Sequence, residues 1–311
     1  MAESISYTPE EVSKILKISR FTVYEMIKRG DLPAYHIGRK VRVEAPDLEQ
    51  YIQKAKTAPP LLSTDSATLP VSTAKNENQF ILCGQDLLLD ILIRHLEKQL
   101  PSCRCLRNYA GSMEGLLALY RGKAHAATCH LWDSDTDTYN LPYVRRLLPG
   151  QATQIINLAC RTEGFYVAKN NPKQIADWGD LAREDIRFIN REPGSGARVL
   201  LDEKLRLLKI ATESVHGYEQ EETSHLAIAS AVARGEADIG LGIEKTALQV
   251  EKISFIPLHL ERYDLVIRKR DIAKSEFQIL IAILRSKEFQ KELTGMGGYD
   301  LTYTGQIMAE T

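Results

Sequence analysis

The sequence predicts two α/β domains of unequal size joined by a linker, and three observations support this. The 311 residues are 44% hydrophobic and 26% charged, a composition typical of globular domains. A segment rich in Pro, Ser and Thr over 55–78 has no helical or strand periodicity, as expected of a linker. Apolar runs and amphipathic segments alternate after it, which favours α/β architecture. We therefore expect domains over 1–54 and 79–311.

The composition of the whole chain excludes several classes of protein. No run approaches the ~18 consecutive apolar residues of a membrane helix, and the N-terminus lacks the pattern of a signal peptide, so we expect a cytoplasmic protein without membrane contact. The net charge of −1 excludes a uniformly basic coat protein for nucleic acid. The five cysteines form no CxxC pair, and we expect reduced thiols and no bound metal cation.

The first domain has the pattern of a winged helix-turn-helix. Thr8 and Ser19 each precede an amphipathic segment, as N-cap residues do, and Glu11 completes a capping box with Thr8. Two short helices joined by a tight turn are predicted from these signals. Apolar alternation over 34–43 then predicts a β-hairpin with a basic tip, and a third helix begins near Ala45.

Positive charge is concentrated on the second helix and the hairpin tip. The segment 14–43 carries eight basic residues against two acidic ones, a net charge of +6 in a nearly neutral chain. Basic side chains at these two places neutralise phosphates and reach base edges in the major groove, although a solvated basic face is the alternative. The residues that we expect to contact a double-stranded DNA operator on this ground are Arg20, Thr22, Tyr24, Lys28, Arg39 and Lys40.

The run YTPEEVSKILKISRFTVYEMIKRGDLPAYHIGRKVRVEAPDLEQYI, from Tyr7 to Ile52, resembles the excisionase-type, MerR-related helix-turn-helix family. In that family the second helix reads the major groove and the hairpin touches the adjacent backbone. The resemblance implies DNA contacts at Ser19, Arg20, Thr22, Tyr24, Arg39 and Arg42.

Small polar residues occur at four predicted strand-to-helix junctions of the second domain. They are Gln85-Asp86, Gly111-Ser112, Gly194-Ser195-Gly196 and Thr223-Ser224. The start of a helix offers unpaired backbone N–H groups and the positive end of the helix dipole, which together bind anions. Ligands of open α/β sheets bind beyond the carboxyl ends of the strands. The four junctions together predict an anion-binding cleft, although each one alone is explained by helix capping.

The motifs INREPGSGARVLLD, SHLAIASAVARGEADIGLGIE, GSMEGLLALYRGKAHAA and YNLPYVRRLLPG resemble the periplasmic-binding-protein-like domain of cytoplasmic regulators related to molybdate-binding proteins. The resemblance implies a two-lobed α/β domain of type II, with one lobe over 79–130 and 262–311 and the other over 132–260. It implies an oxyanion effector, molybdate or tungstate, and no further cofactor. The implied ligand-binding residues are Gln85, Asp86, Ser112, Gly194, Ser195, Gly196, Ala197, Arg198, Ser224 and His225.

Two positions depart from those relatives. Gly242-Ile243-Glu244 stands where they place a ligand-binding Tyr, and Tyr166 is a possible replacement, although core packing also explains it. Asp86 is an acid at an anion site, and we expect Arg191 or Arg198 to offset its charge.

These features predict a homodimeric transcription regulator that senses a small anion and is not an enzyme. The alternative is an enzyme or binding protein acting on a molybdopterin-like or other small anionic ligand. Its candidate groups are Asp86, His130, Asp133 and His225, but their spacing shows no recognisable nucleophile–base pair or metal set.

Overall fold

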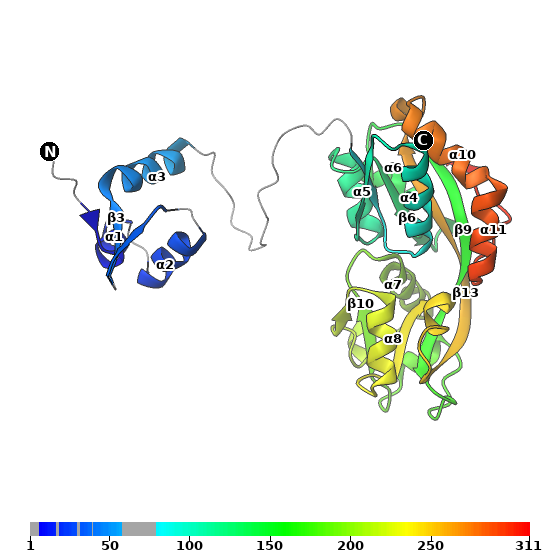
Figure 1. Ribbon diagram of the computed structural model, residues 1–311. Coiled ribbons are helices and arrows are strands. Elements are labelled where there is room, and N and C mark those ends of the chain that lie inside the picture. Colours follow the sequence, from blue (N-terminus) through cyan, green and yellow to red (C-terminus); the bar gives the residue numbers. More distant parts are fainter. Residues whose placement is uncertain (1–5, 17–18, 30–31, 39, 58–78) are drawn as a thin grey trace. The chain divides into compact units, whose positions relative to one another are not determined.

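The computed structural model of the protein describes residues 6–16, 19–29, 32–38, 40–57 and 79–311. The chain forms two compact units, Met1–Ala74 and Lys75–Thr311 (Figure 1). The linker expected over 55–78 lies outside the described residues, except for 55–57, which end the last helix of the first unit.

The N-terminal unit contains three helices and three short strands among its described residues. They are β1 (Ser6–Tyr7), α1 (Pro9–Leu16), α2 (Arg20–Arg29), β2 (Tyr35–Ile37), β3 (Lys40–Glu44) and α3 (Ala45–Thr57). The strands pair antiparallel in the order β1-β3-β2. The helix-turn-helix and the hairpin are as predicted, whereas β1 was not predicted because two residues are too few to show periodicity.

Side-chain caps explain where the first two helices begin. Thr8 Oγ1 accepts a hydrogen bond from the Glu11 amide at 3.2 Å, and Glu11 Oε2 accepts one from the Thr8 amide at 2.8 Å. The predicted capping box is therefore confirmed. Ser19 Oγ accepts from the Thr22 amide at 3.1 Å and caps α2. The buried core that these helices share with the sheet consists of Val12, Val23, Met26, Leu32, Val43 and Leu48.

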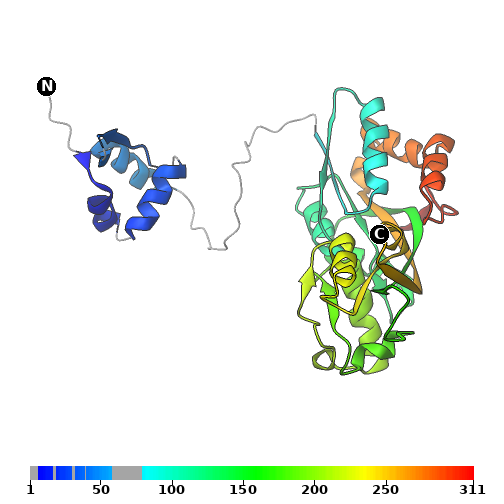
Figure 2. The same ribbon diagram turned by 60° about the horizontal axis from the view of Figure 1, so that its bottom comes forward.

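The larger unit consists of two lobes, and two long strands, β9 (Thr153–Ala168) and β13 (Ile253–Arg268), pair antiparallel along both (Figure 1). The other elements of the first lobe are β4 (Gln79–Cys83), α4 (Leu88–Gln99), β5 (Arg104–Asn108), α5 (Ser112–Tyr120), β6 (Ala126–Cys129), β7 (Trp132–Asp133), β8 (Thr138–Tyr139), α6 (Leu141–Leu147), η3 (Lys269–Asp271), α10 (Ser275–Arg285), α11 (Lys287–Met296) and β14 (Ile307–Glu310). Helices α4, α10 and α11 pack together over one core in this lobe (Figures 1 and 2).

The second lobe is built on the same plan. Its elements are η1 (Trp178–Ala182), β10 (Phe188–Arg191), α7 (Gly196–Leu208), η2 (Thr212–Ser214), β11 (Glu221–Glu222), α8 (His225–Ala233), β12 (Ile239–Ile243) and α9 (Glu244–Ala247). The strand order is β5-β4-β6-β13 in the first lobe and β11-β10-β12-β9 in the second, with β14 added beside β9. The inner strands are parallel, as predicted, and the crossing strands β9 and β13 are antiparallel to their neighbours.

The repeated plan determines where the helix starts lie. In the first lobe α4 and α5 follow β4 and β5, and in the second lobe α7 and α8 follow β10 and β11. Because these strands are parallel within each lobe, their carboxyl ends lie at one edge of the sheet, and each following helix begins there.

The lobe boundary differs from the expected one. The segment after Leu131 was assigned to the second lobe, but Val144 and Leu148 at α6 pack with Leu116 of α5 in the first. The β7–β8 hairpin reaches the other lobe, where Trp132 packs with Leu200 of α7. Apolar periodicity identifies a buried face but not the partner that covers it, so the sequence could not place α6.

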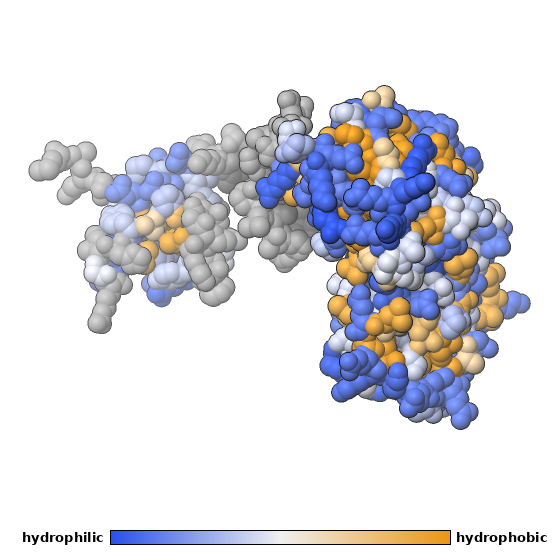
Figure 3. Space-filling view, turned by 45° about the vertical axis from the view of Figure 1, so that its right-hand side comes forward, coloured by the Kyte–Doolittle hydropathy of each residue, from blue (hydrophilic) through white to orange (hydrophobic). Residues whose placement is uncertain are grey.

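On the face shown in Figure 3, hydrophilic residues surround separate patches of hydrophobic ones. Among these residues no helix has the length and apolar character needed to cross a bilayer.

Candidate ligand-binding site

A cavity of about 150 Å³ lies between the two lobes, at the carboxyl ends of their parallel strands. All four strand-to-helix junctions border it. The junction residues in its wall are Gln85, Asp86, Leu87, Gly111, Ser112, Ser195, Gly196, Ser224 and His225. The lobes thus bring together residues that are far apart in the chain.

Helices α4, α5, α7 and α8 all start at this cavity, and the serines at the starts of the last three have different roles. Ser195 Oγ accepts from the Arg198 amide at 3.3 Å and caps α7, and Ser224 Oγ accepts from the Ala227 amide and caps α8. The cap of α5 is Gly111, which has no side chain. Ser112 Oγ instead accepts from the His130 amide at 3.3 Å, so its hydroxyl hydrogen can point to a ligand.

The lobes touch each other beside the cavity. The Met113 amide of α5 donates to the Gly194 carbonyl oxygen at 3.0 Å. Arg191 Nη2 donates to Gln85 Oε1 at 2.7 Å, again from one lobe to the other. Gly196 lies against the His130 ring so closely that a Cβ there would lie 2.4 Å from two ring atoms. These contacts describe a closed two-lobed domain.

The charge of Asp86 is compensated within the protein. Its carboxylate accepts from Arg161 Nη1 at 2.5 Å, from the Tyr299 hydroxyl at 2.7 Å and from the Leu88 amide at 2.7 Å. Arg161 lies in the middle of β9, is 3% exposed and also forms an ion pair with Glu261. The expected offset therefore comes from Arg161, which the sequence analysis did not name, and not from Arg191 or Arg198. No local motif marks Arg161, because its partners come from other strands and helices.

The remaining cations at the cavity also have protein partners. Arg191 donates to Glu192 Oε2 at 2.7 Å and to the Thr223 carbonyl oxygen. Lys245 donates to the carbonyl oxygen of Met296. A bound anion would therefore meet backbone amides, hydroxyls and guanidinium groups whose charges are already compensated.

His225 is held in its neutral form at the cavity wall. Burial is the main cause that lowers its pKa well below the usual value of an imidazole, and the nearby guanidinium groups of Arg191 and Arg161 lower it further. Its Nδ1 is buried and has no hydrogen-bond partner among the described residues. The neutral ring therefore has a nitrogen that a ligand can satisfy.

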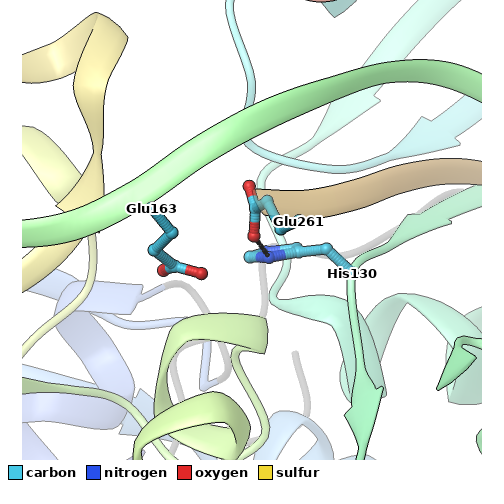
Figure 4. Close-up of side chains that lie close together, drawn as sticks. All are labelled: His130, Glu163 and Glu261. Atoms are coloured by element: carbon cyan, nitrogen blue, oxygen red, sulfur yellow. Dashed lines mark hydrogen bonds and ion pairs between the residues drawn. The ribbon is translucent and has the colours of Figure 1, made fainter. Parts of the chain in front are cut away.

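Behind the cavity wall, one histidine and two carboxylates lie together (Figure 4). His130 Nδ1 lies 2.5 Å from Glu261 Oε2. Burial, and then the neighbouring carboxylate Glu261, raise the pKa of Glu163 well above its usual value. Burial alone would raise the pKa of Glu261 as well, but Arg161 and His130 lower it. The two neighbouring carboxyl groups are therefore shifted in opposite directions, with the pKa of Glu163 raised and that of Glu261 lowered.

Three of the expected ligand-binding residues do not line the cavity, namely Gly194, Ala197 and Arg198. Ala197 is part of the second lobe's core. The Arg198 guanidinium binds Asp202 and Glu221 and stacks on Tyr218. The helical rotation after Gly196 turns these side chains away from the cleft.

Tyr166 does not supply a ligand-binding hydroxyl. It is fully buried and donates to the Ile243 carbonyl oxygen at 2.7 Å. The hydroxyl groups at the cavity that the sequence analysis missed belong to Thr128, Thr246, Tyr263 and Tyr299. Thr128 and Tyr263 share a hydrogen bond of 2.6 Å, which the pairing of β6 with β13 creates.

On the N-terminal unit, the expected DNA-contacting residues Arg20, Thr22 and Tyr24 of α2 are exposed. The Arg20 guanidinium lies 5.6 Å from the centre of the Tyr24 ring, and the Thr22 hydroxyl contacts that of Ser19. Lys40 is exposed on β3, whereas Arg42 is half-buried. Arg39 and the side chain of Lys28 lie outside the described residues.

Comparison with known proteins agrees with this geometry. Residues 93–285 match the family model of the PBP superfamily domain, and residues 6–56 match that of a helix-turn-helix domain. The uncharacterized protein YvgK of Bacillus subtilis is 42% identical, and the match covers 100% of both chains. The thiosulfate-binding protein of Escherichia coli is 35% identical over 92 residues, which are 28% of this chain and 26% of that protein.

A solved structure has the same two-lobed fold as the larger unit. It is described as a proposed phosphate ABC transporter substrate-binding protein from Clostridium perfringens with bound phosphate. It superposes with a TM-score of 0.53 at 16% identity and covers 72% of this chain and 99% of its own.

Fold and cavity together define a two-lobed binding-protein domain that follows a helix-turn-helix domain in one chain. The chain belongs to the PBP superfamily domain family. This architecture fits a ligand-sensing, DNA-binding regulator and resembles such regulators rather than enzymes.

Proposed function

We propose that the protein is a transcription regulator that binds an operator through its N-terminal unit and senses a small tetrahedral oxyanion, molybdate or tungstate, in the cavity. The observation that carries this proposal is the meeting of the N-terminal ends of α5, α7 and α8, drawn from both lobes, at one small cavity. Such an arrangement binds a compact anion with backbone amides and hydroxyls.

The size of the cavity supports a compact ligand. A cavity of about 150 Å³ holds a molecule of about six non-hydrogen atoms such as benzene. A tetrahedral oxyanion has about five such atoms, so it fits without opening the lobes. A molybdopterin-like ligand is several times larger and would need the contact between Met113 and Gly194 to break.

The chemistry of the wall supports an oxyanion that needs no free cation. Ser112 Oγ, the neutral ring of His225 and the first amides of α7 and α8 are hydrogen-bonding groups without net charge. The partial similarity to a thiosulfate-binding protein points to the same class of ligand.

Signal transmission follows from the two-lobed design. A ligand that binds the closed domain more tightly than the open one shifts the population towards closure. In a homodimer this shift would change the spacing of the two DNA-binding units on operator half-sites. We propose a homodimer because one small winged unit offers few phosphate contacts.

A thermal-shift panel of molybdate, tungstate, sulfate, phosphate and thiosulfate tests the ligand. At 100 times its dissociation constant, the true ligand adds ~2.7 kcal/mol to the free energy of unfolding. Operator binding is then measured by fluorescence anisotropy on DNA from upstream of the protein's own gene, at several salt concentrations, with and without that ligand. Absence of any stabilising oxyanion, or of salt-dependent DNA binding, would refute the proposal.

A further inference from the structure

We propose that His130, Glu163 and Glu261 form a binding site for one divalent first-row transition cation, with Zn²⁺ as the reference ion. The site lies behind the wall of the cavity and goes beyond the proposed oxyanion response, since it requires neither the oxyanion nor DNA. The ligand atoms of the three residues all lie within 4.8 Å of one another.

To hold a cation, the ligand atom of Glu163 must move closer to the other two, whereas His130 Nδ1 and Glu261 Oε2, which lie 2.5 Å apart, must separate to admit the ion. Zinc binds imidazole nitrogen and carboxylate oxygen at about 2.0–2.2 Å, so two of its ligands are at most about 4.3 Å apart. The residues come from three places that the fold holds rigidly. Glu163 is on β9, Glu261 is on β13, and His130 directly follows β6. One nitrogen and two carboxylate ligands suit zinc and its neighbours better than Mg²⁺ or Ca²⁺, which prefer oxygen ligands alone.

The second, independent observation is the state of the Glu163 side chain. It is 0% exposed, and neither carboxylate oxygen has a hydrogen-bond partner among the described residues. A buried carboxylate is normally satisfied by donors, because an unpaired one costs several kcal/mol. Figure 4 shows this carboxylate pointing towards His130 and Glu261. Something positive therefore belongs between the two carboxylates, either a proton or a metal cation.

The charges around the three residues favour a divalent cation. Among the described residues, Arg161 is the one arginine or lysine that forms an ion pair with this group, and it is shared between Asp86 and Glu261. When both glutamates act as cation ligands they are ionised, and together with Asp86 they place three carboxylates around the guanidinium of Arg161, which leaves a charge of −2. A divalent cation cancels this charge of −2, whereas one proton on Glu163 leaves a charge of −1.

His130 would link such a cation to the cavity. Its ring borders the cavity and lies against Gly196, and its amide donates to Ser112 Oγ. A cation bound at Nδ1 fixes the orientation of the ring, and hence the surface against which the second lobe closes. By linkage, cation binding and closure then strengthen each other.

Isothermal titration of untagged, chelator-treated full-length protein with ZnCl₂ tests the site, with Co²⁺ as a spectroscopic probe. We expect one cation per chain and a visible Co²⁺ spectrum typical of nitrogen and oxygen ligands, without thiolate charge-transfer bands. Glu163→Gln and, separately, His130→Ala should weaken binding at least tenfold.

Two further variants serve as controls. Glu292→Gln neutralises a carboxylate that lies 2.9 Å from His95, where no third metal-ligating side chain lies close among the described residues, so cation binding should not change. Cys103→Ser removes the most accessible cysteine and should also leave binding intact.

Failure of the wild-type protein to bind either cation overturns the proposal and leaves a shared proton as the occupant. Equal binding by the wild-type protein and Glu163→Gln, or loss of binding in Cys103→Ser, overturns it as well. None of these results depends on the oxyanion panel, so the site and the proposed function fail separately.

Discussion

The backbone amide of Met113 donates to the carbonyl oxygen of Gly194 at 3.0 Å and so joins the first turn of α5 in one lobe to the loop before α7 in the other. Gly194 has a φ of +83°, and a Cβ there would lie 3.1 Å from the Met113 Cβ. This close approach of two backbones is possible because one of the residues is glycine. Closure of the domain therefore depends on contacts between small groups, and larger groups at the contact should oppose it.

Gly196→Ala should weaken the ligand response without unfolding the protein. The new methyl group would lie 2.4 Å from the His130 ring, so the lobes must separate. We expect at least a tenfold loss of affinity for the oxyanion that stabilises the wild-type protein, or about 1.4 kcal/mol, measured by titration calorimetry. The control is Gly295→Ala in α11, where no atom lies within 4 Å and helix propensity predicts a gain of about 1 kcal/mol in stability. Equal affinity of the two variants would show that this contact is not needed for binding.

Ser112→Ala should weaken oxyanion binding by about tenfold to a hundredfold. Ser112 is 4% exposed at the cavity and its hydroxyl can donate to a ligand, and a hydrogen bond to a charged partner contributes about 1.5–3 kcal/mol. Ser275→Ala is the matched control, because Ser275 is also the first residue of a helix but is exposed. The readout is the shift in melting temperature with oxyanion concentration. An unchanged shift in Ser112→Ala would place the ligand elsewhere.

Arg161→Met should destabilise the protein by about 3–5 kcal/mol, because it leaves the buried carboxylates of Asp86 and Glu261 without their cation. Urea unfolding measures the loss. Arg234→Met breaks the exposed ion pair with Glu236 and should cost less than about 1 kcal/mol. A small effect of Arg161→Met would mean that the carboxylates are already neutral.

The His225 ring should make stability depend on pH below neutrality. Its pKa is lowered in the folded protein, so below about pH 6.5 the unfolded chain takes up a proton that the folded one does not. The free energy of unfolding therefore falls as the pH drops, by up to about 1.4 kcal/mol per pH unit. His225→Gln should remove this contribution. Urea unfolding at pH 6.5 and 5.5 compares the two proteins, and parallel pH profiles would argue against a neutral buried ring.

Arg20→Ala should weaken operator binding and lower its dependence on salt. Each phosphate contact contributes about 0.9 to the slope of log affinity against log salt concentration, so the slope should fall by about one. Arg20 is exposed on α2 beside Tyr24. Arg270→Ala, an exposed arginine of the larger unit, should leave the slope unchanged. The same slope in both variants would remove Arg20 from the DNA-contacting residues.

Local signals accounted for much of the fold. Three features could be predicted from the sequence because they depend on neighbouring residues. They are the capping box of Thr8 and Glu11, the cap at Ser19 and the alternation of strands and helices. Junction residues at the cavity, such as Ser112 and Ser195, could be predicted for the same reason, because the start of a helix is marked by neighbouring residues. Ala197 and Arg198 were wrongly assigned to the cavity because the resemblance gave their place in the chain but not the direction in which α7 points their side chains.

By itself the sequence determined the two α/β units, the helix starts and the basic face of α2, because hydrophobic periodicity and capping act over a few residues. The tertiary structure alone decided the pairing of Asp86 with Arg161 and the meeting of His130, Glu163 and Glu261. These groups come from strands that are distant in the chain and adjacent in the sheet, where burial removes water and makes each charge depend on its partner.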